Sequence, residues 1–218
     1  NLASVMGRDD AASYLTEANS IIVDDGTGSS VVSASDGAIL AGFTADVGFD
    51  VVDTADNIAA EVAGVSNSGD ELNSVDANDV INTVVVSGGD VDATEAAVIQ
   101  SISGYVGTAS DYDITDNASA LISAGDEVLN VAGVDIVTAS NTSVNANIGG
   151  DLAGFTAEIE FDVVDNAAGL IAEMGGADVA GHLTEANSIT VNDGAGSSVV
   201  NASDGAMLAS FTADIDFD

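Results

Sequence analysis

The segment Phe49-Asp-Val-Val-Asp-Thr-Ala-Asp-Asn-Ile58 shows how this chain is built. Val47, Phe49 and Val51 alternate with acidic residues or glycine, and a period of two is typical of a strand with one buried face. After Asp53 the apolar residues recur at helical spacing: Ala55, Ile58, Ala59 and Val62. The segment therefore predicts a strand that ends at Asp53 and a helix that follows it.

Segments of the same kind recur along the chain. Short β-branched or aromatic runs that end in Asp begin at Ile21, Phe49, Tyr112, Phe161 and Ile189. In the regular parts of the sequence their starts lie about 28 residues apart, and self-similarity at a fixed spacing is typical of repeat architectures. The middle is irregular, with looser variants that begin at Thr83 and Val134.

The two ends of the chain are near copies of each other. The run Tyr14–Ser20 returns as His182–Ser188, and Gly37–Asp46 returns as Gly205–Asp214. Residues 1–50 and 169–218 are therefore interpreted as equivalent repeats, and residues 51–168 as the more divergent middle repeats. Because both termini fall inside the pattern, we expect residues 1–218 to be one continuous repeat array, a fragment of a longer chain.

Strand, helix and turn in each unit predict an α/β fold with parallel strands joined by helical crossovers, which are right-handed as a rule. We favour an open right-handed solenoid of strand-helix coils, with the parallel sheet on one side. The outward strand positions are acidic, whereas a doubly wound sheet buries both faces and has continuous apolar strands. A doubly wound α/β domain and a parallel β-helix remain the alternatives.

The composition restricts the partners. The chain has 37 acidic residues against one basic residue, a net charge of −36 and no cysteine. Nucleic acids and anionic lipids need a basic surface, so we expect neither as a partner and expect cations instead. No apolar run approaches the roughly 20 residues that cross a bilayer, so membrane insertion is not expected.

An acidic ladder is the main candidate site. If the coils stack in register, carboxylates at the strand ends lie about 4.8 Å apart, where two of them repel by roughly 0.8 kcal/mol in water. The ladder residues are Asp25, Asp53, Asp116, Asp165 and Asp193. Each lies where a helix is predicted to start, so the simplest interpretation is helix capping. The alternative is Ca²⁺ bound between the rungs, because carboxylate oxygens are preferred calcium ligands.

Two further acidic groups are candidate calcium ligands because they are locally dense. The first comprises Asp90, Asp92 and Glu95, and the second comprises Asp111 and Asp113 together with Asp116 of the ladder. Neither group fits an EF-hand loop. Apart from Ca²⁺, the sequence predicts no cofactor.

We expect no enzyme. A catalytic site needs an asymmetric constellation in one coil, whereas the acidic residues here recur from coil to coil. The one histidine, His182, is replaced by Tyr14 in the equivalent repeat, and a catalytic base would hardly be exchanged for tyrosine between copies.

Val52-Asp-Thr-Ala-Asp-Asn-Ile58 resembles the Val-x-Asp-Thr-Ala-x-Asn-Ile repeats of very large secreted surface proteins of aquatic bacteria, and Thr115–Leu121 and Val164–Leu170 resemble them more loosely. The resemblance implies an extracellular or cell-surface structural role. We therefore expect a segment of a filament, surface layer or adhesin stalk that self-associates end to end or laterally. The alternative is a calcium-binding adhesive or ligand-binding module.

Overall fold

A computed structural model describes residues 31–41, 48–62, 72, 81–141, 143–174, 182–192, 205–206 and 208. The chain divides into two compact units, residues 1–113 with 131–135, and residues 114–130 with 136–218. The described strands form a six-stranded sheet in the order β1-β2-β3-β4-β5-β6 and a two-stranded sheet, β7-β8. The predicted α/β class, with parallel strands alternating with helices, is confirmed.

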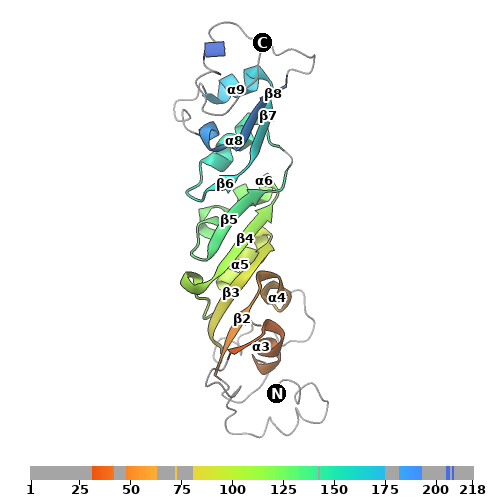
Figure 1. Ribbon diagram of the computed structural model, residues 1–218, viewed down its shortest axis with the longest axis vertical. Coiled ribbons are helices and arrows are strands. Elements are labelled where there is room, and N and C mark those ends of the chain that lie inside the picture. The colour runs from red at the N-terminus through yellow and green to blue at the C-terminus, as the bar shows by residue number, and fades with distance from the viewer. Residues whose placement is uncertain are drawn as a thin grey trace. The chain divides into compact units, whose positions relative to one another are not determined.

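The first unit places strands and helices in strict alternation (Figure 1). Its elements are β1 (Val31–Val32), α3 (Ala34–Ala41), β2 (Phe49–Asp53), α4 (Ala55–Ala60), β3 (Ile81–Val91), α5 (Ala93–Ser101) and the short 3₁₀ helix η2 (Gly107–Ala109). Strand β2 pairs in parallel with both β1 and β3. Helix α3 contacts β2 and α4, and α4 contacts β3 and α5. Each of these two helices therefore packs on the strand that follows it and beside the next helix. We call one strand with the helix that follows it a coil.

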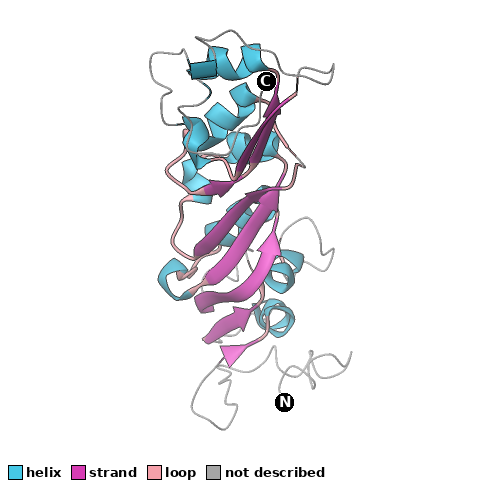
Figure 2. Cartoon of the chain, turned by 45° about the horizontal axis from the view of Figure 1, so that its top comes forward, coloured by secondary structure: helices cyan, strands magenta, loops and turns pink. Residues whose placement is uncertain are grey.

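The second unit also combines strands with helices, but less regularly, because α7 follows α6 directly and β7 follows β6 directly. Its helices are α6 (Ala118–Ala124), α7 (Asp126–Leu129), α8 (Ala146–Ala153), α9 (Ala167–Met174) and the 3₁₀ helix η3 (His182–Glu185), and its strands are β6 (Ile159–Glu160), β7 (Asp162–Asp165) and β8 (Ser188–Val191). Strands β4 (Asp111–Asp116) and β5 (Val134–Ala139) contribute residues to both units. β5 pairs in parallel with β6, and β7 with β8. Helices α8 and α9 lie together beside β7 and β8 (Figure 2).

The strands alternate between a buried and an open face, as the sequence predicts. Phe49 and Val51 are fully buried, whereas Val52 between Val51 and Asp53 is 37% exposed. Helix α4 contributes Ile58, also fully buried, to the same core. Since small residues such as Ala34 and Ala38 form the buried side of α3, the helix approaches its strand closely.

A second internal repeat, at a shorter offset than that of the chain ends, relates residues 31–62 to residues 143–174. The packing of the equivalent glycine in each copy illustrates this repeat. A Cβ atom on Gly37 would lie 2.9 Å from Val51 Cγ2 and 3.3 Å from Phe49, and one on Gly149 would lie 2.9 Å from Val163 Cγ2 and 3.3 Å from Phe161. In both units, therefore, a glycine lets a helix approach the apolar residues of the next strand.

Candidate functional site

Asp53 connects two successive coils. Its side chain is on the same strand face as Phe49 and Val51, because strand residues alternate, so its carboxylate lies at the helix side of the sheet. Oδ2 accepts a hydrogen bond from the backbone N–H of Ala34, the first residue of α3, at 2.9 Å. Oδ1 accepts hydrogen bonds from Thr54 N at 2.9 Å and from Asn57 Nδ2 at 2.7 Å. The carboxylate thus binds its own helix start and the helix of the preceding coil.

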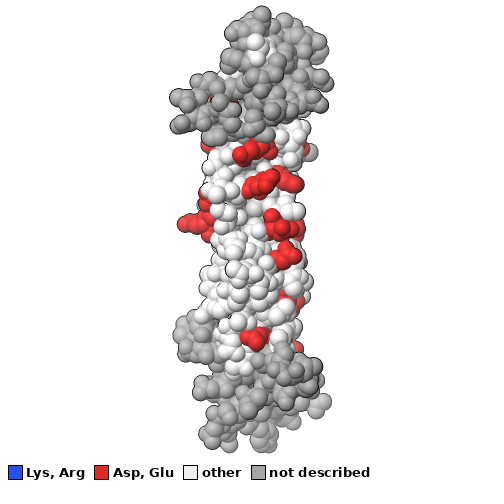
Figure 3. Space-filling model, turned by 60° about the vertical axis from the view of Figure 1, so that its left-hand side comes forward, with Lys and Arg blue, Asp and Glu red and all other residues white. Residues whose placement is uncertain are grey.

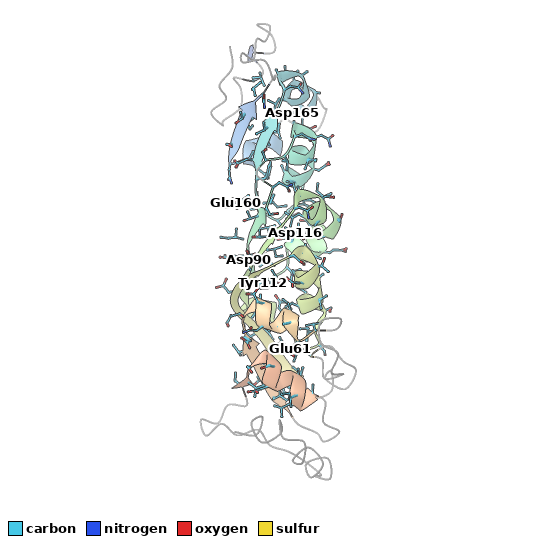
Figure 4. All side chains as sticks on the ribbon, turned by 90° about the vertical axis from the view of Figure 1, so that its right-hand side faces the viewer. Glu61, Asp90, Tyr112, Asp116, Glu160 and Asp165 are labelled. Atoms are coloured by element: carbon cyan, nitrogen blue, oxygen red, sulfur yellow. The ribbon has the colours of Figure 1, made fainter. Side chains whose placement is uncertain are left out.

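Asp165 makes the same connection in the second unit. Its Oδ2 accepts from the backbone N–H of Ala146, the first residue of α8, at 3.0 Å. Its Oδ1 accepts from Asn166 N at 2.7 Å and from Asn166 Nδ2 at 3.0 Å. Asp165 lies where β7 passes into α9 (Figure 4). Its carboxyl group is close to α9, because the Cβ of an alanine at Gly169 would lie 2.6 Å from its carboxyl carbon. The geometry found at Asp53 is therefore a repeated feature.

Asn141 occupies the equivalent place between β5 and α6, and the sequence analysis missed it. Its Oδ1 accepts from the backbone N–H of Ala118, the first residue of α6, at 2.6 Å. A search for carboxylates cannot find a neutral amide. The signal in the sequence was that Asn141 comes shortly after a strand-like run, at about the place where aspartate ends the other strands. At this junction, therefore, a neutral amide oxygen accepts the hydrogen bond without a negative charge.

Asp53 and Asp165 cap helices, but each caps a different helix from the one expected. The N-cap of α4 is Thr54, and those of α6 and α8 are Asn117 and Asn145. Asn117, Asn145 and Asn166 each accept a hydrogen bond from the third residue of the helix that follows, α6, α8 and α9 respectively. The prediction that a ladder aspartate is the N-cap of the helix directly after it is therefore wrong for Asp53 and Asp165. Each precedes the N-cap and satisfies the first amide of the preceding coil's helix instead.

The hydrogen bonds also decide the pKa of Asp53. Burial by itself raises the pKa of this carboxyl group, but the hydrogen bonds from Asn57, Ala34 and Thr54 outweigh burial and hold the pKa below its ordinary value. The charged form is therefore the one that the folded protein favours.

The remaining ladder residues differ in what the structure says of them. Asp116 Oδ1 accepts from Asn117 N at 2.7 Å and from Asn117 Nδ2 at 2.9 Å. Asp25 and Asp193 lie outside the described residues.

The spacing of the expected ladder is wrong where the strand register is given. Asp53 is paired with Val86 on the next strand, and Asp165 with Val191. At these rungs the neighbour is apolar, so the expected repulsion between adjacent carboxylates does not arise there.

In the first of the two dense acidic groups, two residues cap a helix. Asp92 and Glu95 form a capping box at the start of α5: Glu95 N donates to Asp92 Oδ1 at 2.8 Å, and Asp92 N donates to Glu95 Oε2 at 3.1 Å. Asp90 is exposed near the end of β3, and Asp111 and Asp113 are exposed and half-buried residues of β4. Within the described part of the chain, no group of three or more His, Cys, Asp or Glu side chains is placed to hold a metal ion.

Outward-facing aspartates pair with hydroxyl groups of the next strand. Thr83 Oγ1 donates to Asp50 Oδ1 at 2.7 Å in the first unit, and Ser188 Oγ donates to Asp162 Oδ1 at 2.6 Å in the second. Both pairs are in strand register. On the face that Figure 3 shows, the described surface carries acidic side chains and no lysine or arginine.

Asp126 is a further polar link between coils of the second unit. Its Oδ1 accepts from the backbone N–H groups of Thr156 at 2.8 Å and of Ala157 at 3.2 Å. Desolvation raises the pKa of Asp126, but the hydrogen bonds from Ala157 and Thr156 outweigh it and hold the pKa below its ordinary value.

Among the residues that the structure describes, Tyr112 is the largest buried side chain with a polar group, and it belongs to the core of the first unit. Gln100 Nε2 donates to its hydroxyl oxygen at 2.8 Å. Burial raises the pKa of Tyr112 far above its ordinary value. The phenol is therefore neutral and serves as a hydrogen-bonding member of the core.

Comparisons of this chain with protein-family models, curated proteins and solved structures found no match. A search of the described helices also found none that is long and apolar enough to cross a membrane.

Proposed function

We propose that this chain is a structural segment of a long extracellular repeat protein, built as an open right-handed solenoid of about 28-residue coils. In this role it contributes length and stiffness to a filament, surface layer or adhesin stalk. The parent protein self-associates through copies of the same repeat, end to end or laterally. Catalysis forms no part of the proposed role.

The repeated coil-to-coil hydrogen bond is the observation that carries the proposal. Asp53 and Asp165 bind the first amides of α3 and α8 with matching atoms and nearly equal distances, 2.9 and 3.0 Å. A solenoid is stable because each repeat contacts its neighbours, so its polar groups are expected at the junctions between repeats. The side chains of this candidate site are used for such junctions, which supports a structural role.

Electron microscopy of the intact parent protein tests the structural role. The proposal predicts rods or sheets with an axial repeat, assembled from the array. A population of separate compact particles would contradict it.

Antibodies against residues 81–141, applied to intact cells that make the parent protein, test its location. Labelling before permeabilisation is expected, and labelling only after permeabilisation would contradict an extracellular role.

A calcium-binding adhesive or ligand-binding module is the second candidate. The charge supports it, because a net charge of −36 calls for counterions, and exposed carboxylates such as Asp90 and Asp111 are accessible to them. The test is thermal unfolding in Ca²⁺, in Mg²⁺ and in chelator, with NaCl at matched ionic strength. Specific calcium at 100 times its dissociation constant stabilises by about 2.7 kcal/mol. Equal melting temperatures in all matched salts would reduce the role of cations to screening.

A further inference from the structure

The hydrophobic pattern of these strands leaves their alignment ambiguous. In β2 the inward residues Phe49 and Val51 are both apolar and fully buried. A shift of the strand by one residue would turn them outward, but a shift by two would keep the same residues facing inward. Since coils of this chain resemble one another, a two-residue slip is a realistic competitor to the native arrangement.

We propose that Asp53 and Asp165 set the register in which each coil joins the coil before it. In the native register Val32 is paired with Val51, which brings Asp53 opposite the start of α3. A two-residue slip would bring Val51 or Ala55 to that place instead. Neither side chain can accept a hydrogen bond, so the amide of Ala34, a fully buried residue, would have no partner.

The second unit follows the same rule. Val144 is paired with Val163, and Asp165 comes opposite the start of α8. A slip by two residues would bring Val163 or Ala167 to the Ala146 amide, and both are apolar. In one direction the slip would also move the carboxylate of Asp165 toward the apolar interior, where an unpaired charge is strongly disfavoured.

The outer face adds a link in the opposite direction. Asp50 accepts from Thr83, and Asp162 accepts from Ser188, each on the following strand. Each of these two strands is thus aligned to the preceding coil by an inward aspartate and to the following strand by an outward one. This inference concerns alignment and does not depend on the proposed structural role.

Engineered disulfides can report the register, because the chain contains no cysteine. Thr138 and Glu160 are paired in the native register of β5 and β6. Neighbouring strands are about 4.8 Å apart, so T138C/E160C falls within the range of about 4.4–6.8 Å between Cα atoms that a disulfide needs. A partner two residues further along is about 8 Å away. The pairs I136C/E160C and T138C/D162C therefore form only after a slip, one for each direction.

Each cysteine pair is oxidised during refolding in three backgrounds: the parent sequence, D165N and D165L. Asparagine keeps the acceptor and leucine removes it at similar size. The parent and D165N are expected to form the native pair alone. In D165L the yield of the native pair relative to the slipped pairs is expected to fall about tenfold.

The matched control is D151L, because Asp151 is an exposed acidic residue of α8, and it is expected to behave as the parent. A D165L protein that forms the native pair alone overturns the proposal, since another feature would then set the register. A D165L protein that forms none of the three pairs also overturns it, because Asp165 would then be required for folding as such rather than for alignment.

Discussion

The Oδ2 atom of Asp165 accepts a hydrogen bond from the backbone N–H of Ala146, which precedes it by 19 residues, at 3.0 Å. Asp53 stands in the same relation to Ala34, also 19 residues earlier, at 2.9 Å. The first amides of a helix have no partner within the helix. Here the following coil supplies that partner, so the start of each of these helices is completed by a neighbour in space.

Two substitutions of Asp53 distinguish the loss of its hydrogen-bond acceptor from the loss of its negative charge. We expect D53A to lower the free energy of unfolding by about 1–3 kcal/mol, because the amide of Ala34 loses its partner in a buried setting. D53N keeps an acceptor oxygen and is expected to cost less than about 1 kcal/mol, as the natural use of Asn141 in this role suggests. Urea denaturation measures both. Equal losses in the two variants would show that the negative charge is what matters.

Lowering the pH is expected to weaken the junction at Asp53. The folded state holds the pKa of this carboxyl group below its ordinary value of 3.8, so the unfolded chain takes up the proton first as pH falls. The contribution of Asp53 is therefore fully present above the unfolded pKa and is lost as pH falls through the folded pKa. The difference in unfolding free energy between the parent and D53N, measured from neutral pH down to about pH 2, reports it. A difference that does not shrink on acidification would contradict this account.

Filling the space at Gly149 tests the close approach of α8 to its strand. An alanine Cβ would lie 2.9 Å from Val163 Cγ2 and 3.1 Å from Leu183, and overpacking of a core costs about 1–3 kcal/mol. The better helix propensity of alanine offsets about 1 kcal/mol of that cost. We expect a net loss of about 1 kcal/mol in chemical denaturation. Asn147→Ala, at an exposed position of the same helix, is the control and is expected to be neutral or slightly stabilising. A stabilised G149A would show that the contact is loose.

The outward pair of Asp50 and Thr83 is expected to contribute little stability. Cross-strand polar pairs are worth about 0.2–1 kcal/mol, so Thr83→Val should cost about 0.5 kcal/mol. A double-mutant cycle with Asp50→Asn isolates the pair from other effects of each change. A coupling energy well above 1 kcal/mol would make the outer pairs a main source of stability rather than an aid to alignment.

Much of the fold could be predicted from local patterns. The alternation around Phe49 and Val51 correctly gave the strand and its buried face, and the helical spacing after Asp53 correctly gave α4. These features depend on residues close together in the sequence, where a single pattern decides which face is buried.

The partners of the site could not be predicted because they depend on the alignment between coils. Asp53 is adjacent to its own helix, so the sequence favoured that helix, whereas Ala34 becomes its partner only when β1 and β2 are in register. The ladder spacing failed for a related reason. The pairing of β2 with β3, which includes a register shift between Phe49 and Asp50, brings Val86 opposite Asp53.

The central claim is that the chain is an open solenoid, and measuring how the molecule lengthens with added repeats tests it most directly. Because residues 169–218 nearly copy residues 1–50 in sequence, fusing residues 1–168 ahead of residues 1–218 continues the sequence pattern without a break. Small-angle X-ray scattering of this fusion and of the 218-residue chain compares their maximum dimensions and cross-sections. A solenoid predicts a maximum dimension that grows in proportion to the number of coils at constant cross-section. Radii of gyration near the value for compact globules, about 17 Å for the single chain, would contradict it.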